Sequence, residues 1–439
     1  MEMKTRTIAA IGALALSTLF FAGCGGAEPG AAESSSDSVN NASASVWALN
    51  GGFHEVMWKD SFARWNADNP ENQIDLEFFA NDSYKEKIRT AIGSDNAPTL
   101  IYGWGGATLR DYAETGKIVD LTDDLGGELE RVIPTIAEGG KVDGKLYAIP
   151  HTGSQPVVLY YNKKLFNEAG IEAPKTWNEL LKAVDVFKER GVIPISLAGA
   201  SKWTSMMWLE YLFDRIGGPD VFNRIVENEK GAWSDPAVKK SLEYAQELVK
   251  AGAFGDGFGS VSSDADADAA LLYTGKAAML LQGAWTYGRF VTDAPEFLES
   301  GDLGYTVFPL VESGKGGING VVGNLTNYWS ISTGAPKEAQ ETAKKYLRTV
   351  LEDEYLQKMV EGGDIPNTVN SDAFIEGSPQ KEFTSFGYDI VKNSTSYQLS
   401  WDQDLPSATS QVLLDQIQML FNLSVTPDQF IETMNATIK

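Results

Sequence analysis

The stretch VWALNGGFHEVMWKDSFARWNADNPENQIDLEFFANDSYKEKIRTAIGSDNAPTLIY, residues 46–102, alternates short apolar runs with longer amphipathic ones. The apolar runs at 46–49, 74–78 and 99–102 have the length of β-strands. The runs at 55–67 and 84–92 carry apolar residues at helical spacing. This alternation predicts a mostly parallel sheet with helices on both faces. Ligands bind such sheets at the carboxyl ends of the strands, so residues that directly follow a strand are candidates for a binding site.

The rest of the chain is more helical but continues the same pattern. Residues 157–161 and 328–331 are predicted to be strands, and residues 176–189, 204–215 and 236–251 are predicted to be long amphipathic helices. A glycine-rich stretch at 301–323 precedes the strand at 328–331. About 395 residues follow position 44, which is more than one hydrophobic core usually organises, so we expect two domains.

The N-terminal segment has the features of an export signal. A basic start precedes an apolar run at 8–22 that is too short to span a bilayer. The small pair Ala22-Gly23 stands directly before Cys24, the only cysteine of the chain, and resembles a bacterial lipobox, in which that cysteine is lipidated. We therefore predict a lipoprotein signal peptide at 1–23, lipidation of Cys24 and a flexible tether at 24–44.

The composition is acidic, with 36 Lys and Arg against 60 Asp and Glu and a formal net charge of −24. Nucleic acids and anionic membrane surfaces need a cationic patch, so the charge argues against both as partners. No later apolar stretch reaches the length of a membrane span. We expect a soluble body that contacts the membrane only through its N-terminal lipid.

The motifs of several common enzyme classes are missing. Only two histidines occur, His54 and His151, and neither a Gly-x-Ser-x-Gly elbow nor a phosphate-binding loop is found. Asp264, Asp266 and Asp268 imitate the start of a calcium loop, but the required Gly and Glu are replaced, so we expect a solvated helix start. We expect no catalytic residues, no metal and no cofactor. A secreted glycosidase with two facing carboxylates remains an alternative.

Several of the 11 tryptophans stand beside glycine or polar residues in predicted loops. These are Trp104, Trp203, Trp285 and Trp401. Sugar rings have apolar C–H faces and a rim of hydroxyls, so a sugar site needs flat aromatic platforms together with amides or carboxylates. The residues therefore favour carbohydrate binding.

Motifs in the centre of the chain resemble one family over nearly the full length. They are GKLYAIP at 144–150, LYYNKKLF at 159–166, PKTWNEL at 174–180, GKAAM at 275–279 and GAW at 283–285. In order and spacing they resemble the extracellular solute-binding proteins of oligosaccharide importers, the maltose-binding-like receptors of ABC transporters. The resemblance implies a two-lobed α/β fold of the periplasmic-binding-protein type II, each lobe a mostly parallel sheet flanked by helices, with the ligand cleft between them. Residues 45–152 and 306–352 would form the N-terminal lobe, and residues 153–305 and 353–439 the C-terminal lobe.

The resemblance also implies aromatic platforms and polar ligand contacts. The platforms are Trp104 on the N-terminal lobe and Trp203, Trp285 and Trp401 on the C-terminal lobe. The polar contacts are Gln155, at a position where the family often has a ligand-binding acid or amide, and Asn50, Asn81, Asn324 and Asp402. Many maltose receptors carry charged residues after the first strand, whereas this chain has Asn50-Gly51-Gly52, which argues against maltose.

Within the family, the segments around 154–162, 208–211 and 271–283 resemble actinobacterial receptors for xylobiose and related xylo-oligosaccharides. The resemblance implies a monomeric, non-enzymatic receptor on the extracellular face of the cell membrane. It would capture a short oligosaccharide by hinge closure and deliver it to an ABC permease. Receptors for maltose-, cello- or chito-type sugars remain alternatives, as do receptors for a polyol, a peptide or an iron complex.

Overall fold

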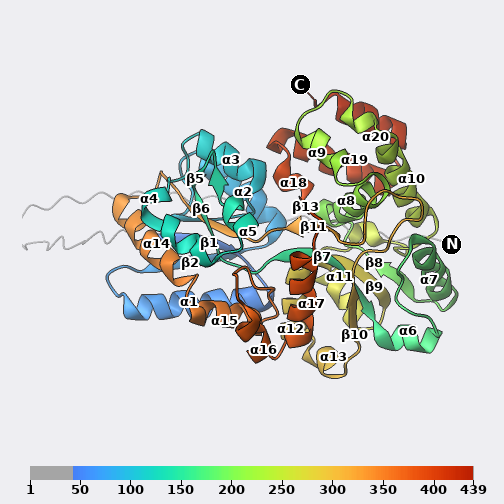
Figure 1. Ribbon diagram of the computed structural model, residues 1–439, viewed down its shortest axis with the longest axis horizontal. Helices are drawn as coiled ribbons and strands as arrows, with labels where there is room; N and C mark the ends of the chain where they lie inside the picture. The colour runs from blue at the N-terminus through green and yellow to red at the C-terminus, as the bar shows by residue number, and fades with distance from the viewer. Residues whose placement is uncertain (1–42, 439) are drawn as a thin grey trace, which may run out of the picture. The chain divides into compact units, whose positions relative to one another are not determined.

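The computed structural model describes residues 43–438 (Figure 1). The predicted signal peptide, Cys24 and nearly all of the predicted tether lie outside the described residues. The described part of the chain belongs to a single compact unit. None of its helices is both long enough and apolar enough to cross a membrane.

The first sheet has the strand order β2-β1-β3-β12-β6. Its strands are β1 (Ala44–Leu49), β2 (Ile74–Phe79), β3 (Leu100–Gly103), β6 (Ala148–Pro150) and β12 (Tyr328–Ile331). The strand β1 pairs in parallel with β2 on one side and with β3 on the other, as the alternation at 46–102 predicts. Only β12 runs against its neighbours β3 and β6, so the sheet is mostly parallel.

Helices cover this sheet and enclose an aromatic core. They are α1 (Gly52–Asp68), α2 (Asn81–Gly93), α3 (Gly106–Glu114), α4 (Thr122–Leu125), α5 (Pro134–Gly139), α14 (Lys337–Thr349) and α15 (Asp353–Glu361). From α1, Trp58 and Phe62 are buried, and Phe62 stacks on Tyr346 of α14 with ring centroids 4.3 Å apart. Helices that are far apart in the sequence are thus joined through one core.

The second sheet has the order β13-β11-β7-β9-β8, and β10 also pairs with β7. Its strands are β7 (Gln155–Asn162), β8 (Ile193–Ser196), β9 (Ala277–Gly283), β10 (Leu303–Thr306), β11 (Gly320–Asn324) and β13 (Ser396–Leu399). The strand β7 runs antiparallel to β9, β10 and β11, whereas β8 and β13 run parallel to their partners. Each sheet therefore contains a single reversed strand, β12 in the first and β7 in the second. A separate two-stranded ribbon pairs β4 (Lys141–Val142) with β5 (Lys145–Leu146).

A larger set of helices packs around the second sheet. They are α6 (Lys163–Ala169), α7 (Trp177–Glu189), α8 (Lys202–Gly217), α9 (Asp220–Val226), α10 (Pro236–Lys250), α11 (Ala267–Tyr273), α12 (Tyr287–Asp293), α13 (Pro295–Glu299), α17 (Lys381–Lys392), α18 (Trp401–Asp404), α19 (Ser407–Phe421) and α20 (Pro427–Asn435). The helix α16 (Asp372–Gly377) lies between α15 and α17, and its Phe374 packs against the core of the first sheet. The sequence Thr-x-x-Glu starts α7 with a capping box between Thr176 and Glu179, which satisfies two backbone N–H groups. The next helix along the chain, α8, is buried along nearly its whole length and lies at the centre of this core.

The strand pairing corrects the predicted lobe boundaries. The chain leaves the first sheet at Pro150 and enters the second at Gln155, next to the predicted boundary at 152. The predicted return to the N-terminal lobe at residue 306 is wrong, because β11 pairs with β7 and β13 of the second sheet, and the chain crosses back only between Asn324 and Tyr328. The predicted boundary at 352 is also too early, since α15 packs into the core of the first sheet. The family resemblance from which these boundaries were predicted does not reveal the positions, because they depend on which distant strand each segment of this chain meets.

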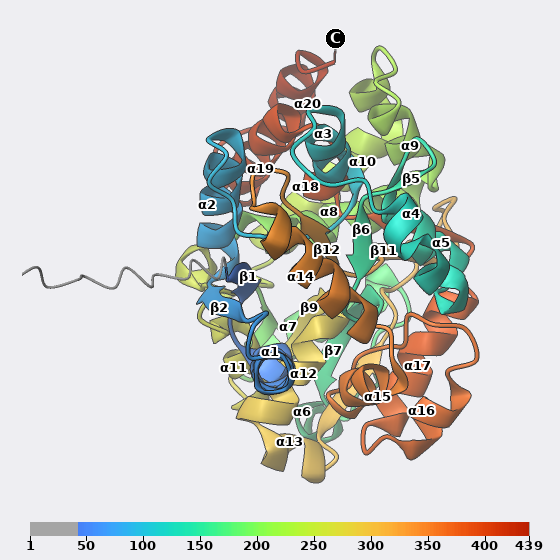
Figure 2. The same ribbon diagram turned by 90° about the vertical axis from the view of Figure 1, so that its left-hand side faces the viewer.

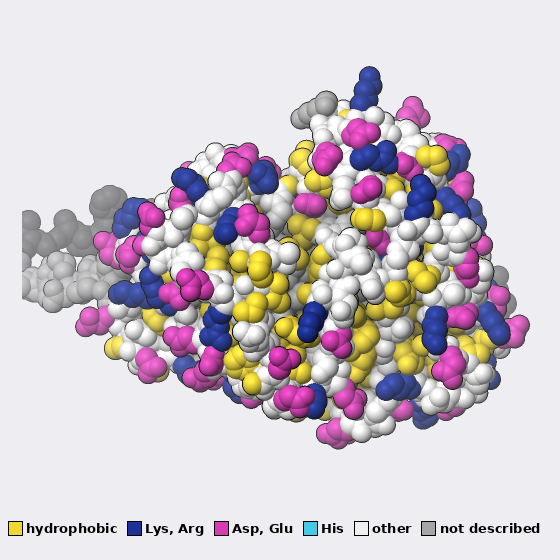
Figure 3. All heavy atoms as spheres, viewed as in Figure 1, with side chains coloured by type: hydrophobic (Ala, Val, Ile, Leu, Met, Phe, Trp, Pro, Cys, Tyr) yellow, Lys and Arg dark blue, Asp and Glu magenta, His cyan; other side chains and the backbone are white. Residues whose placement is uncertain are grey.

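The face of the molecule shown in Figure 3 carries charges of both signs. On the face shown in Figure 3, acidic and basic side chains are spread around the periphery, and hydrophobic side chains gather towards the middle. Figure 2 shows that α1, from the helices of the first sheet, lies beside α12, from those of the second, in agreement with their packing contacts. The two sets of helices therefore meet along one side of the molecule.

Candidate ligand-binding site

A large hollow lies between the two sheets. It has an empty volume of about 1170 Å³, including its open mouth, and side chains from both sheets and from the segments between them line it. The first sheet contributes the segments directly after β1, β2 and β3, where Asn50, Asn81 and Trp104 lie. The second contributes the start of β7, the end of β9 and the N-terminal part of α8. The carboxyl ends of the parallel strands thus open into the hollow, as in other open α/β sheets.

Aromatic side chains form two of its walls. Trp203 and Trp285, from the second sheet's side, lie with ring centroids 6.0 Å apart and planes tilted by 56°. Trp104, from the first sheet's side, packs edge-on against Tyr102 at 5.1 Å. A ligand in the hollow therefore meets flat indole rings from both sides, and its apolar faces can leave water there.

A glycine explains how Trp285 reaches its place. The indole folds back over Gly283, the last residue of β9, and a Cβ added at this glycine would overlap the ring. The backbone of Gly283 has φ −70°, a value that any residue adopts, so the requirement concerns space. The sequence Gly283-Ala284-Trp285 thus encodes a strand end that leaves room for an aromatic platform.

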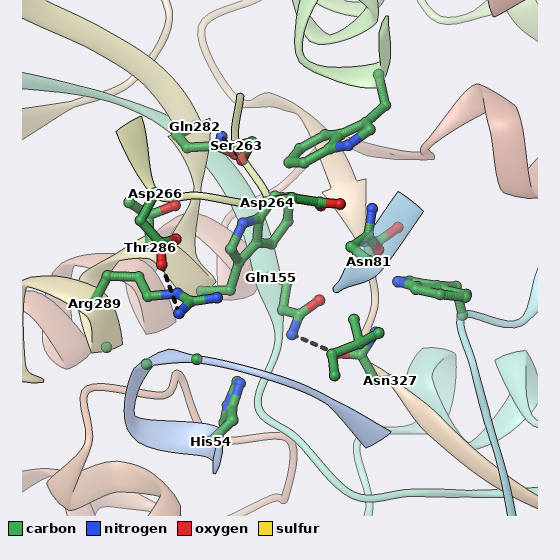
Figure 4. Close-up of a pocket in the computed structure, with 18 of the residues that line it drawn as sticks. His54, Asn81, Gln155, Ser263, Asp264, Asp266, Gln282, Thr286, Arg289 and Asn327 are labelled. Atoms are coloured by element: carbon green, nitrogen blue, oxygen red, sulfur yellow. Dashed lines mark hydrogen bonds and ion pairs between the residues drawn. The ribbon is translucent and has the colours of Figure 1, made fainter. Parts of the chain in front are cut away.

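Amide side chains line the floor near the crossings between the sheets. Gln155 Nε2 donates to Asn327 Oδ1 at 2.7 Å (Figure 4). Asn324 Oδ1 and Asn327 Nδ2 are buried and have no hydrogen-bond partner among the described residues. Since an unpaired buried polar group is costly, these atoms are suited to accept from and donate to ligand hydroxyls.

The guanidinium of Arg289 lies beside Asp266 in Figure 4. Arg289 Nη1 pairs with Asp266 Oδ2 at 2.8 Å, and Arg289 Nη2 donates to the backbone oxygen of Asn50 at 2.9 Å. Gly51 and Gly52 have φ of 87° and 61°, and a Cβ at either would run into the Arg289 side chain. The glycines after β1 therefore make room for a basic side chain from α12, on the second sheet's side of the hollow.

The three aspartates that imitate a calcium loop also face the hollow. Burial raises the pKa of Asp266 to about 6, although the Arg289 charge opposes the shift, and burial likewise raises the pKa of Asp268. Asp268 Oδ2 accepts from Gln282 Nε2 at 2.9 Å, and Asp264 Oδ2 accepts from the backbone N–H of Asp82 at 3.2 Å. Within residues 43–438, no group of three or more His, Cys, Asp or Glu side chains is placed to hold a metal ion. The expected solvated helix start is wrong for this segment, because α11 packs its first turn against the cleft.

Two further charged contacts border the hollow. Lys85 Nζ donates to Asp402 Oδ2 at 2.7 Å and lies 4.9 Å from the centre of the Trp104 ring. His54 Nε2 lies 2.8 Å from both carboxylate oxygens of Asp364, and Asp364 Oδ2 also accepts from the N–H of Gly153 at 3.0 Å. Asp364 thereby joins α1 to the crossing between β6 and β7.

Eight of the nine predicted ligand residues come together around this hollow. They are Asn50, Asn81, Trp104, Gln155, Trp203, Trp285, Asn324 and Asp402. The prediction for Trp401 as a platform is wrong: its side chain is 0% exposed and stacks on Phe222 at 4.7 Å in the core. The short helix α18 turns Trp401 inward and places Asp402 and Gln403 at the hollow.

Sequence reasoning missed several lining residues. They include Phe53, His54, Lys85, Asp264, Asp266, Asp268, Gln282, Arg289 and Asp364. Lys85 and Arg289 stand on α2 and α12, where a sequence pattern indicates only a solvated helix face. The spacing of the three aspartates was an available signal, but it indicated a metal loop rather than a cleft.

A model of the bacterial extracellular solute-binding protein family matches residues 50–357 of the chain. The chain belongs to this family. Its relatives include the diacetylchitobiose binding protein DasA of Streptomyces coelicolor, 25% identical over 390 residues, which cover 87% of this chain and 86% of DasA. An ABC transporter extracellular-binding protein of Pyrococcus horikoshii is 26% identical over 209 residues, 47% of this chain and 46% of that protein, so this match spans less than half of either.

Solved structures agree with this membership. A protein from a study of xylan utilization by the thermophilic bacterium Caldanaerobius polysaccharolyticus superposes with a TM-score of 0.81 at 27% identity, covering 90% of this chain and all of that one. The expected two-lobed α/β fold of a solute-binding protein is confirmed. The hollow lies between the two sheets, where the resemblance to this family implies the ligand cleft.

Proposed function

We propose that this solute-binding protein is the receptor of an ABC transporter for a short oligosaccharide, preferentially xylobiose or a related xylo-oligosaccharide. One observation carries the proposal: three tryptophans from both sides of the cleft surround a floor of amides and carboxylates. The aromatic rings suit the C–H faces of sugar rings, and the amides and carboxylates suit the hydroxyls. The relatives support a sugar ligand, since DasA binds diacetylchitobiose by its name.

The preference for xylose units rests on two further observations. The solved structure at 27% identity comes from a study of xylan utilization. Xylopyranose lacks the exocyclic hydroxymethyl group of hexoses, so the edge of a xylose ring needs less space in the cleft than the edge of a hexose. The side chain of Arg289, which extends over Gly51 and Gly52, takes up space on the first lobe's side of the cleft.

Capture would proceed by closure of the two lobes around the sugar. Contacts that bridge the lobes already surround the cleft: Arg289 donates to the Asn50 backbone, and Asp264 accepts from the Asp82 backbone. A sugar that stacks on one lobe and completes hydrogen bonds on the other would favour this closed arrangement, because it binds that state more tightly. The closed receptor would then be recognised by the permease.

Isothermal titration with xylobiose, cellobiose, maltose and diacetylchitobiose tests the proposal. We expect xylobiose to bind most tightly and Trp203→Ala to weaken its binding. Trp47→Ala is the matched control, since Trp47 is half-buried and does not line the hollow. No heat with any sugar would refute the proposal, and tighter binding of another disaccharide would refute the preference for xylose.

The proposal also states how the receptor is held at the membrane and whether it has enzymatic activity. Lipidation of Cys24 would hold the monomeric receptor at the extracellular face of the membrane, and mass spectrometry of the membrane fraction detects the modification. The matching family model and the relatives named for their function describe binding proteins rather than enzymes. We propose that the protein is not an enzyme; release of xylose from xylotetraose on prolonged incubation would contradict this.

A further inference from the structure

A second hollow adjoins the ligand cleft. It has an empty volume of about 780 Å³, including its open mouth, and lies between α2 and α3 on one side and α18 and α19 on the other. The two hollows share four lining residues, Lys85, Trp104, Asp402 and Gln403. These four residues are therefore the partition between the cleft and the second hollow.

The centre of the partition is an ion pair that joins the two lobes. Lys85 is carried by α2, which follows β2 of the first sheet, and Asp402 by α18, which follows β13 of the second. Their atoms Nζ and Oδ2 are 2.7 Å apart, and the side chain of Asp402 is only 7% exposed. Gln403 Nε2 donates to the same Oδ2 at 3.0 Å, and the Lys85 ammonium lies over the Trp104 ring. Two further contacts thus hold the pair, which is costly to separate inside the cleft.

The second hollow has the chemistry of a sugar site. Its lining includes Trp104 and Tyr112 together with Arg89, Thr108, Asp111 and Gln411. Aromatic rings, an amide, a carboxylate and a guanidinium are the groups that suit the faces and hydroxyls of a sugar ring. A saccharide chain leaving the cleft past Trp104 would enter this space if the ion pair did not stand in its way.

We infer that the Lys85–Asp402 pair is a gate that limits the bound saccharide to the first hollow, so that it determines ligand length. This inference rests on the proposed function, since it assigns a specificity to the same cleft. With the gate closed, the saccharide is confined to the first hollow, and a longer chain binds only by separating an ion pair whose carboxylate is 7% exposed. Removal of both charged groups would join the hollows and add binding contacts for the further rings.

The test compares xylobiose, xylotriose and xylotetraose by isothermal titration in the native protein and in Lys85→Ala/Asp402→Ala. Both partners are removed together, because a single charge left without its partner in the partition would itself destabilise the protein. The matched control is Lys239→Ala/Asp428→Ala, an ion pair with the same separation of 2.7 Å that lines neither hollow. We expect the affinity for xylotetraose relative to xylobiose to rise about tenfold in the gate variant and to stay unchanged in the control.

A substitution that blocks the second hollow checks that any gain in affinity comes from binding there. Thr108→Trp, which would fill part of the second hollow from α3, should cancel the gain when added to the gate variant and change nothing in the native background. Native protein that binds xylotetraose as tightly as xylobiose, or a gate variant with an unchanged ratio, would overturn the inference while leaving the receptor function intact. Native protein that binds no sugar would instead refute the proposed function and the gate with it. If the double alanine variant does not fold, Lys85→Met/Asp402→Asn serves in its place with the same expected rise.

Discussion

The replacement of Gly283 by alanine isolates the contribution of one aromatic platform. The added Cβ would overlap the Trp285 ring atoms Cε3, Cζ3 and Cη2, while the backbone at φ −70° accepts any residue. The ring is the far end of a side chain with two rotatable bonds, so it can rotate away at little cost to the fold. The variant should therefore fold normally but present a displaced platform beside Trp203.

The size of the effect follows from the area that a sugar ring covers. A pyranose laid on an indole removes roughly 50 Å² of apolar surface from water, and at about 25 cal/mol per Å² this contributes about 1.2 kcal/mol. We expect Gly283→Ala to raise the Kd for xylobiose about tenfold, because about 1.4 kcal/mol corresponds to a factor of ten. Isothermal titration measures the Kd, and a thermal melt of the same samples checks that the fold is retained.

Two comparisons distinguish this reasoning from a general effect of the added methyl group. Gly93→Ala is the matched control, since an added Cβ at Gly93 meets nothing within 4 Å, and its affinity should equal that of the native protein. Trp285→Ala should lose as much affinity as Gly283→Ala, and the double variant should lose little more, because both act through one ring. An unchanged Kd in Gly283→Ala, or fully additive losses, would refute the assignment of Gly283 as the space that Trp285 needs.

Further predictions concern the charged cleft and the core. Arg289→Met removes the donor to the Asn50 backbone and leaves Asp266 without its partner, so titration should show at least about tenfold weaker sugar binding. The pKa of Asp266 is raised from 3.8 to about 6, so between these values the folded protein holds a proton that the unfolded chain has lost, and stability falls as pH rises. Accordingly, the melting temperature of the native protein relative to Asp266→Asn should fall from pH 4 to pH 6; a constant difference would contradict the shift. Trp401→Ala should cost about 3–5 kcal/mol of unfolding free energy in urea, since Trp401 is fully buried; weaker sugar binding with unchanged stability would restore it as a platform.

Much of the first lobe and its binding edge could be predicted from local pattern. The alternation at 46–102 predicts β1, β2 and β3 and the helices between them, and these three strands pair in parallel. Because parallel strands end at the same edge, the residues that follow them, Asn50, Asn81 and Trp104, meet in the cleft. Here the local pattern was sufficient, since each residue's place depends on its own strand end.

Elsewhere the same kind of pattern was not sufficient. From the sequence, the neighbours Trp401 and Asp402 are equally plausible ligand contacts. In the structure Trp401 stacks on Phe222, and only Asp402 faces the cleft. The glycine-rich stretch before Tyr328 could have joined either sheet, and β11 joins the second by pairing with β7. The residues that flank these two segments do not determine either outcome.

The sequence by itself determined the fold class, the family and the use of tryptophans with amides, because periodicity, turn residues and ordered motifs are local properties of the chain. Only the tertiary structure decided that Lys85 meets Asp402, that Arg289 extends over the glycines after β1, and that Asp266 is partly buried beside Arg289. These residues come from helices and loops far apart in sequence, and each one's surroundings are set by close packing between the lobes. The cleft's ligand preference therefore depends on contacts that no single segment encodes.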